Sequence, residues 1–301
     1  MSAYLEDTVA IPLTRPRFGN LLDARTTLVD AGSFEERYEL VLENYKAFEL
    51  FFVNQSLESR LGGDYRIEPA SRLLSEANRL LINLLTSLCS YTEQVSSEFK
   101  SAPSGPVFKT AITRKLADLR KTSFNFGLIE VVRNYAQHVQ MPVEGITARH
   151  SRTTTWPESV FPYCTGASLH AYAGRNRRRQ VGLQHSLAEK VDLRELAYSA
   201  VRTLSELHCS ARSLVQADCV AARDEVAEAL REVNDAIAEA GTVKKKGRPA
   251  KIVELAGGEN GSTESEVSHT LMLEWDDVRI ARAAKNRRPI ADFKKPSGHN
   301  P

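Results

Sequence analysis

The spacing of apolar residues predicts a chain built mainly from amphipathic helices. Apolar side chains recur every three or four residues, the spacing of one helical face, over 33–63, 68–100, 108–123, 126–142 and 186–240. The last of these ranges fits either two long helices or one bent helix. Ser33, with Glu36 three residues later, has the sequence of a capping box and predicts the start of the first helix.

Three other segments lack helical spacing and divide the chain. Residues 1–33 contain prolines and little periodicity, which predicts an N-terminal arm. Residues 143–183 are rich in Thr, aromatic residues, Pro and Gly, and favour a β-hairpin or an irregular insertion. Residues 241–301 predict a basic, flexible or peripheral tail. The expected fold is all-α, an antiparallel helical bundle over 34–240 with the small insertion and the basic C-terminal tail.

Composition and charge give no indication of a metal site, a cofactor site or a membrane-spanning segment. The 301 residues include 40 Lys and Arg against 38 Asp and Glu, a net charge of +2, so only local basic patches favour a polyanionic partner. The four cysteines form no CxxC pair, and we find no HExxH motif, Cys/His cluster or phosphate-binding glycine loop. We therefore expect no metal and no cofactor. The N-terminus lacks a secretory signal and no apolar run has membrane-spanning length, so we expect a cytoplasmic protein without a membrane partner.

Residues 133–138, Arg-Asn-Tyr-Ala-Gln-His, carry the most informative motif in the chain. They resemble the signature of the HEPN superfamily, in which an Arg, often followed by Asn, precedes a His by a short spacer. The resemblance implies a small helical bundle that is usually dimeric. It also implies metal-independent ribonuclease activity, with Arg133, Asn134 and His138 as catalytic residues. Many such proteins act in toxin–antitoxin, anti-phage or CRISPR systems.

The chemistry of RNA cleavage without a metal suits these residue types. Histidine can take up or release a proton near neutral pH, and arginine presents a planar set of donors to phosphate oxygens. On one helix, however, Arg133 and His138 lie about 140° apart, on opposite flanks, while Asn134 and His138 share a flank. A two-fold dimer would bring one protomer's His138 near the other's Arg133, so we expect a homodimer.

The same loose pattern occurs twice more, at Arg179 and His185 and at Arg202 and His208. Neither copy has Asn after the Arg. His208 falls on the apolar stripe of the helix predicted over 186–240, which favours a hydrogen-bonded core histidine over a catalytic one.

Other polar residues are candidates for supporting roles. Asn78, Arg79 and Asn83 belong to the most apolar predicted helix and either support the motif from a second layer or make ordinary hydrogen bonds between helices. Two basic patches close to the motif in sequence are candidates for nucleic-acid contacts, and their alternative role is a solvated surface. These candidates are Lys109, Arg114, Lys115, Arg175, Arg177, Arg178 and Arg179. In the tail, 244–251 is similar to an AT-hook with Arg248 at its centre, or else a basic linker.

The leading hypothesis is an endoribonuclease of a bacterial defence or toxin–antitoxin system that leaves a 2′,3′-cyclic phosphate. Its partners would be the RNA substrate, a second copy of the chain and an antitoxin or sensor protein. The alternative hypothesis is a non-catalytic helical dimer that binds nucleic acid or a partner protein, or that associates with DNA through the segment 244–251.

Overall fold

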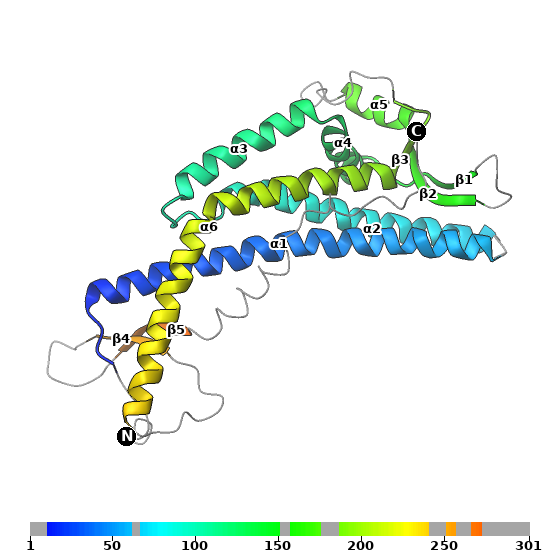
Figure 1. Ribbon diagram of the computed structural model, residues 1–301. Coiled ribbons are helices and arrows are strands. Elements are labelled where there is room, and N and C mark those ends of the chain that lie inside the picture. Colours follow the sequence, from blue (N-terminus) through cyan, green and yellow to red (C-terminus); the bar gives the residue numbers. More distant parts are fainter. Residues whose placement is uncertain are drawn as a thin grey trace. The chain divides into compact units, whose positions relative to one another are not determined.

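A computed structural model of the chain describes residues 11–61, 67–150, 157–175, 187–240, 251–256 and 266–272. Within these ranges the chain is mostly helical and carries one small three-stranded sheet (Figure 1). The helices are α1 (Arg15–Arg60), α2 (Ile67–Gln94), α3 (Gly105–Thr122), α4 (Phe124–His138), α5 (Gly166–Arg175) and α6 (Leu193–Glu239), with a 3-10 turn at Val95–Ser97. The predicted all-α fold with a small insertion is confirmed.

The first helix starts earlier than the sequence predicted. α1 begins at Arg15, so Ser33 lies inside the helix and residues 15–33 are not an extended arm. Pro16 is compatible with this start because it stands in the first turn, where a missing backbone N–H costs nothing. The following turns bury Leu21 and Leu28, which explains why this stretch folds as a helix.

The contacts of the chain divide it into two compact units, and α1, α3 and α6 each contribute to both. Unit 1 comprises residues 1–35, 97–109 and 212–287. Its core pairs small and medium apolar side chains of α1 with those of α6, namely Leu21, Ala24, Leu28, Ala222, Val226 and Ala229. In the same unit, Glu35 accepts two hydrogen bonds of 2.7 Å from the guanidinium of Arg212.

Unit 2 comprises residues 36–96, 110–211 and 288–301 and contains the motif at 133–138. Its core uses the apolar stripes that the sequence predicted, with Leu81 and Leu84 of α2 and Leu204 of α6 fully buried. The helix α2 packs against α4, and α4 packs against α5. Where the sequence predicted two long helices or one bent helix, the structure has one helix, α6, which follows a short strand.

The insertion predicted over 143–183 contains the expected pair of antiparallel strands, and also a helix. β1 (Gly145–His150) pairs antiparallel with β2 (Pro157–Thr165), and β2 pairs antiparallel with β3 (Lys190–Asp192), giving the order β1-β2-β3. α5 follows β2 directly, which the sequence did not predict. A second antiparallel pair, β4 (Lys251–Ala256) and β5 (Glu266–Met272), lies within the segment predicted as a tail.

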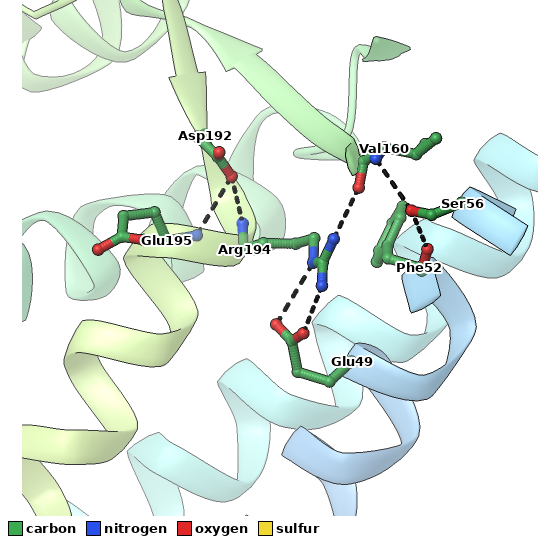
Figure 2. Close-up of polar contacts among 7 residues, drawn as sticks. All are labelled: Glu49, Phe52, Ser56, Val160, Asp192, Arg194 and Glu195. Atoms are coloured by element: carbon green, nitrogen blue, oxygen red, sulfur yellow. Dashed lines mark hydrogen bonds and ion pairs between the residues drawn. The ribbon is translucent and has the colours of Figure 1, made fainter. Parts of the chain in front are cut away.

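Arg194 at the start of α6 connects the sheet to the helices of unit 2 (Figure 2). Its Nη1 donates to the carbonyl oxygen of Val160 on β2 (2.9 Å), and its Nη2 donates to Glu49 of α1 (2.7 Å). The Val160 N–H in turn donates to Ser56 Oγ (3.0 Å). Because β2 is held at both backbone groups of one residue, the hairpin has a fixed attachment to α1.

The start of α6 also shows a helix cap. The carboxylate of Asp192 accepts hydrogen bonds from the backbone N–H groups of Arg194 (2.9 Å) and Glu195 (3.1 Å) (Figure 2). Asp192 with Glu195 three residues later has the sequence of a capping box. Among the helices in the ranges given above, none combines the length and apolar character that crossing a membrane requires.

Candidate functional site around Arg133

The helix α4 carries the motif, and its start is fixed by Ser123. The Ser123 hydroxyl accepts a hydrogen bond from the Phe126 N–H (3.3 Å), the contact of a helix N-cap. α4 ends at His138, shortly before Pro142, as the sequence predicted. One face of the helix is buried through Phe126, Leu128, Ile129, Val131, Val132, Asn134 and Tyr135.

A groove of about 370 Å³ lies along α4 within unit 2. α2, the end of α3 and α4 line it. Its apolar wall consists of Leu85, Leu88, Phe126, Ile129 and Val131. Its polar groups come from Cys89, Thr92, Glu93, Arg120, Glu130, Arg133 and Asn134. The volume falls within the range of about 300–1,000 Å³ that is usual for small-ligand sites.

Arg133 and Asn134 of the motif both line this groove. Arg133 Nη1 donates to Asn134 Oδ1 (3.1 Å), and Arg133 Nη2 lies 4.0 Å from Glu93 Oε1. The Arg133 Nε is buried and has no hydrogen-bond partner among the described residues. A buried donor left without an acceptor costs about 1–3 kcal/mol. Because Nε is buried, the part of the guanidinium that can donate to a bound acceptor is Nη2, which lies beyond hydrogen-bond distance of Glu93.

His138 lies one turn beyond Asn134, at the exposed end of α4. The sequence placed both on the same flank, but the structure separates them by burial: Asn134 is 8% exposed, whereas His138 is exposed. Asn134 lies on the buried face of α4 with Val131 and Tyr135, whereas the helix ends in two exposed residues, Gln137 and His138. Val139 and Met141, directly after the helix, are 52% and 59% exposed, so His138 belongs to an exposed, partly apolar surface.

The groove contains one further ion pair and one neutral thiol. Arg120 Nε donates to Glu130 Oε1 (2.8 Å), so this pair carries little net charge. The Cys89 thiol donates to Glu93 Oε1 (3.0 Å). Burial and this hydrogen bond raise the pKa of Cys89 to about 11. The thiol is therefore protonated at neutral pH and is not a nucleophile.

The three residues predicted to support the motif do not line the groove. Asn78 of α2 donates to the Val143 carbonyl oxygen (3.1 Å) and accepts from the Val143 N–H (2.9 Å), so it holds the chain after α4. Arg79 pairs with Glu76 of its own helix (2.8 Å), and Asn83 is exposed. Of the three, Asn78 makes a hydrogen bond between separate elements, whereas the Arg79 pair lies within α2.

The predicted nucleic-acid contacts are only partly within the described residues. Lys109 and Arg114 of α3 are exposed, and Lys115 is half-buried. Arg114 lies 3.9 Å from the carboxylate of Asp118, with its side chain 85% exposed. Arg175 is the last residue of α5. Arg177, Arg178, Arg179 and Arg248 lie outside the described residues, as does the copy of the motif at 179–185.

The copy of the motif at 202–208 does not form a site. Arg202 is exposed and pairs with Glu206 (3.4 Å), while His208 is fully buried. The His208 ring stacks on Tyr38 at 3.9 Å between ring centroids, and its Nδ1 shares a hydrogen bond with the Tyr91 hydroxyl (2.8 Å). The prediction of a hydrogen-bonded core histidine is confirmed.

Sequence reasoning missed the acidic side of the groove. Glu93 lies 40 residues before Arg133 in the chain, and the apolar spacing of α2 gives no indication of which polar residue faces α4. The only sequence signal is local, since Cys89 and Glu93 are four residues apart and therefore neighbours on a helix.

Among the described residues, no group of three or more His, Cys, Asp or Glu side chains has the arrangement of a metal site. Comparison of the chain with family models, curated proteins and solved structures finds no match.

Proposed function

We propose that this chain is a metal-independent endoribonuclease of the HEPN type that works as a homodimer in a bacterial defence or toxin–antitoxin system. The observation that carries the proposal is the placement of the motif: Arg133 and Asn134 border a groove, and His138 stands exposed at the end of the same helix. An exposed imidazole is accessible both to RNA and to a second protomer. The biological setting rests on the motif's resemblance alone.

In the proposed reaction, one His138 imidazole removes the proton of a ribose 2′-hydroxyl. The 2′-oxygen then attacks phosphorus, and the bond from phosphorus to the 5′-oxygen breaks. The protonated imidazole of the second His138 gives its proton to that 5′-oxygen, and Arg133 donates hydrogen bonds to the charged phosphoryl oxygens. The products are a 2′,3′-cyclic phosphate and a 5′-hydroxyl.

The exposed apolar residues beside His138 support a dimer that forms at this end of α4. Val139 and Met141 expose more than half of their surface, and a second copy would remove this surface from water. An isologous contact at this point brings the two His138 residues together across the two-fold axis. Arg133 and His138 lie on opposite flanks of one helix, and such a contact would bring the His138 of one protomer near the Arg133 of the other.

The test is cleavage of labelled RNA by the purified chain in the presence of EDTA. We expect cleavage to cyclic-phosphate ends, and we expect Arg133→Ala and His138→Ala each to lower the rate by at least about a hundredfold, the usual contribution of a proton-transfer or charge-stabilising group.

The matched controls are Arg202→Ala and His170→Ala, which remove an exposed arginine and an exposed histidine elsewhere in unit 2. Both should cut RNA at the wild-type rate. Retained cleavage in Arg133→Ala or His138→Ala would overturn the proposal, as would RNA binding without cleavage, which would instead support the non-catalytic binding dimer.

A further inference from the structure

The charge balance of the groove argues against a phosphate inside it. Glu93 and Glu130 stand among its polar groups beside Arg120 and Arg133, and Arg120 is already paired with Glu130. A phosphodiester in this space would meet no net positive charge, because Glu130 offsets Arg120 and Glu93 offsets Arg133. A neutral ligand with an apolar face and a polar edge suits the groove better, because Leu85, Leu88 and Ile129 form one wall.

The polar side of the groove presents a donor next to an acceptor. Arg133 Nη2 and Glu93 Oε1 are 4.0 Å apart, which is close enough for attraction and too far for a direct hydrogen bond. The Glu93 side chain is 62% exposed, so its carboxylate can meet a ligand at the mouth of the groove.

We infer that the groove binds a guanine base of the RNA. Every nucleobase offers at least one donor and one acceptor on its Watson–Crick edge, but only guanine has two adjacent N–H donors beside a carbonyl oxygen. A carboxylate accepts both N–H groups at once through its two oxygens, and a neighbouring guanidinium donates to the carbonyl. Unpaired bases of RNA are bound in this way, with the edge hydrogen-bonded and the faces packed on side chains.

This inference rests on the proposed function, since it takes RNA as the ligand, and it assigns Glu93 the role of selecting the base next to the cleaved bond. The base would occupy the groove while its phosphate stays outside, toward the exposed end of α4. Arg133 would serve both, because a guanidinium has five N–H donors, one for the guanine carbonyl and others for the phosphoryl oxygens. Glu93 is thus a specificity-determining residue and takes no part in the proton transfers.

Binding of mononucleotides to the full chain tests the inference without requiring cleavage. By isothermal titration calorimetry we expect GMP to bind on the order of tenfold or more tightly than AMP, CMP or UMP, because it makes one additional hydrogen bond to a charged group. Glu93→Gln should remove this preference, because an amide presents one acceptor oxygen in place of two. Glu206→Gln, which alters a comparably exposed carboxylate on α6, should keep it. Equal binding of the four nucleotides, absence of GMP binding, or an unchanged preference in Glu93→Gln would overturn the inference.

Mapping of product ends from a random-sequence RNA pool separates this inference from the nuclease proposal. Enrichment of G beside the cleaved bond, lost in Glu93→Gln, supports both. Cleavage without base enrichment leaves the nuclease proposal standing and overturns the guanine site. Selective GMP binding by a chain that cuts no RNA would support the guanine site and overturn the nuclease proposal.

Discussion

Arg133 donates a hydrogen bond to its own neighbour in the chain, Asn134, across 3.1 Å from Nη1 to Oδ1. The contact joins a cation whose side chain is 26% exposed to a buried amide, and it fixes the guanidinium at the edge of the groove. Asn134 therefore has a definite role in the proposed site, which is to orient Arg133 without neutralising its charge.

This relationship predicts the effect of Asn134→Asp. A carboxylate at this position would form a charge-assisted hydrogen bond with Arg133 and cancel its positive charge toward a phosphate. We expect the kcat/KM for RNA cleavage to fall by about tenfold or more, since hydrogen bonds to charged groups contribute about 1.5–3 kcal/mol. Steady-state cleavage of a defined RNA measures the effect.

The control for Asn134→Asp is Asn125→Asp on the same helix. Asn125 donates to Ser199 Oγ (2.9 Å) and does not line the groove. Its replacement should leave kcat/KM near the wild-type value. An equal loss of activity in both variants would show that Asn134 acts through the stability of α4 and not through Arg133.

A second prediction concerns the dimer. Met141→Lys places a charge on the exposed apolar surface beside His138, where a contacting second copy would have to desolvate it. We expect the variant to sediment as a monomer at concentrations where the wild type is a dimer, and to lose RNA cleavage while keeping the helical circular-dichroism spectrum of the folded chain. Leu214→Lys, at a position of α6 that is 37% exposed, is the control and should keep both properties. A wild-type chain that is monomeric at all concentrations would contradict the proposed site.

A third prediction is a pH dependence of stability that arises from Glu144. Its carboxylate accepts hydrogen bonds from the Thr165 N–H (3.2 Å) and the Cys164 thiol (3.4 Å) at the junction of β2 and α5. Burial by itself would raise the pKa of Glu144, but the hydrogen bonds from Ser168, Thr165 and Cys164 outweigh it, so the pKa lies below 4.5. A carboxyl whose pKa is lowered by folding stabilises the native state above its unfolded pKa and loses this contribution as the pH falls.

The measurement compares the melting temperatures of the wild type and Glu144→Gln at about pH 7 and about pH 3.5. The wild type should melt at a higher temperature than Glu144→Gln at the higher pH, and the difference between them should narrow as the pH falls below 4.5, the ordinary pKa of a glutamate. Glu206→Gln removes only an exposed ion pair and should differ little from the wild type. A gap for Glu144→Gln that stays constant over this range would show that the carboxylate does not act through its charge.

The sequence predicted those elements whose position depends on residues close together in the chain. The apolar stripes of α2 and α6, the end of α4 before Pro142 and the hairpin in the insertion all depend on residues close together in the chain. The start of α1 was misplaced because Ser33 and Glu36 match a capping box, although Leu21 and Leu28 continue the buried face toward the N-terminus. A capping-box sequence does not mark the start of a helix when the turns before it are also helical and bury apolar side chains.

The groove could not be predicted, because it depends on pairs that are distant in the chain. Arg133 meets Glu93 only because α2 packs against α4, and no periodicity specifies that partner. Asn78 shows the same limit, since its polar character indicated a hydrogen bond but not that Val143 would be the partner. The residue types of the motif indicated a chemistry, while their exposure became known only from the packing around α4.

The last prediction concerns the turn before α3 in unit 1. Phe99 has a positive φ of 56°, and its carbonyl oxygen accepts from the Ala102 N–H (3.2 Å). A Cβ at Gly105 would lie 2.2 Å from this same oxygen. Because the carbonyl is fixed by the turn and the Phe99 ring is buried, the clash cannot be relieved by a side-chain rotation. We expect Gly105→Ala to lower the free energy of unfolding by about 1–3 kcal/mol, the usual cost of an overpacked site.

Gly19 in α1 provides a matched comparison, because a Cβ there would meet nothing within 4 Å. Gly19→Ala should raise the free energy of unfolding by about 0.4–1 kcal/mol, since alanine restricts the unfolded chain and favours a helix. Urea denaturation followed by circular dichroism measures both variants. Opposite signs are the expected result; a neutral Gly105→Ala would mean that the turn at 99–105 adopts another conformation, in which Gly105 is not pressed against the Phe99 carbonyl.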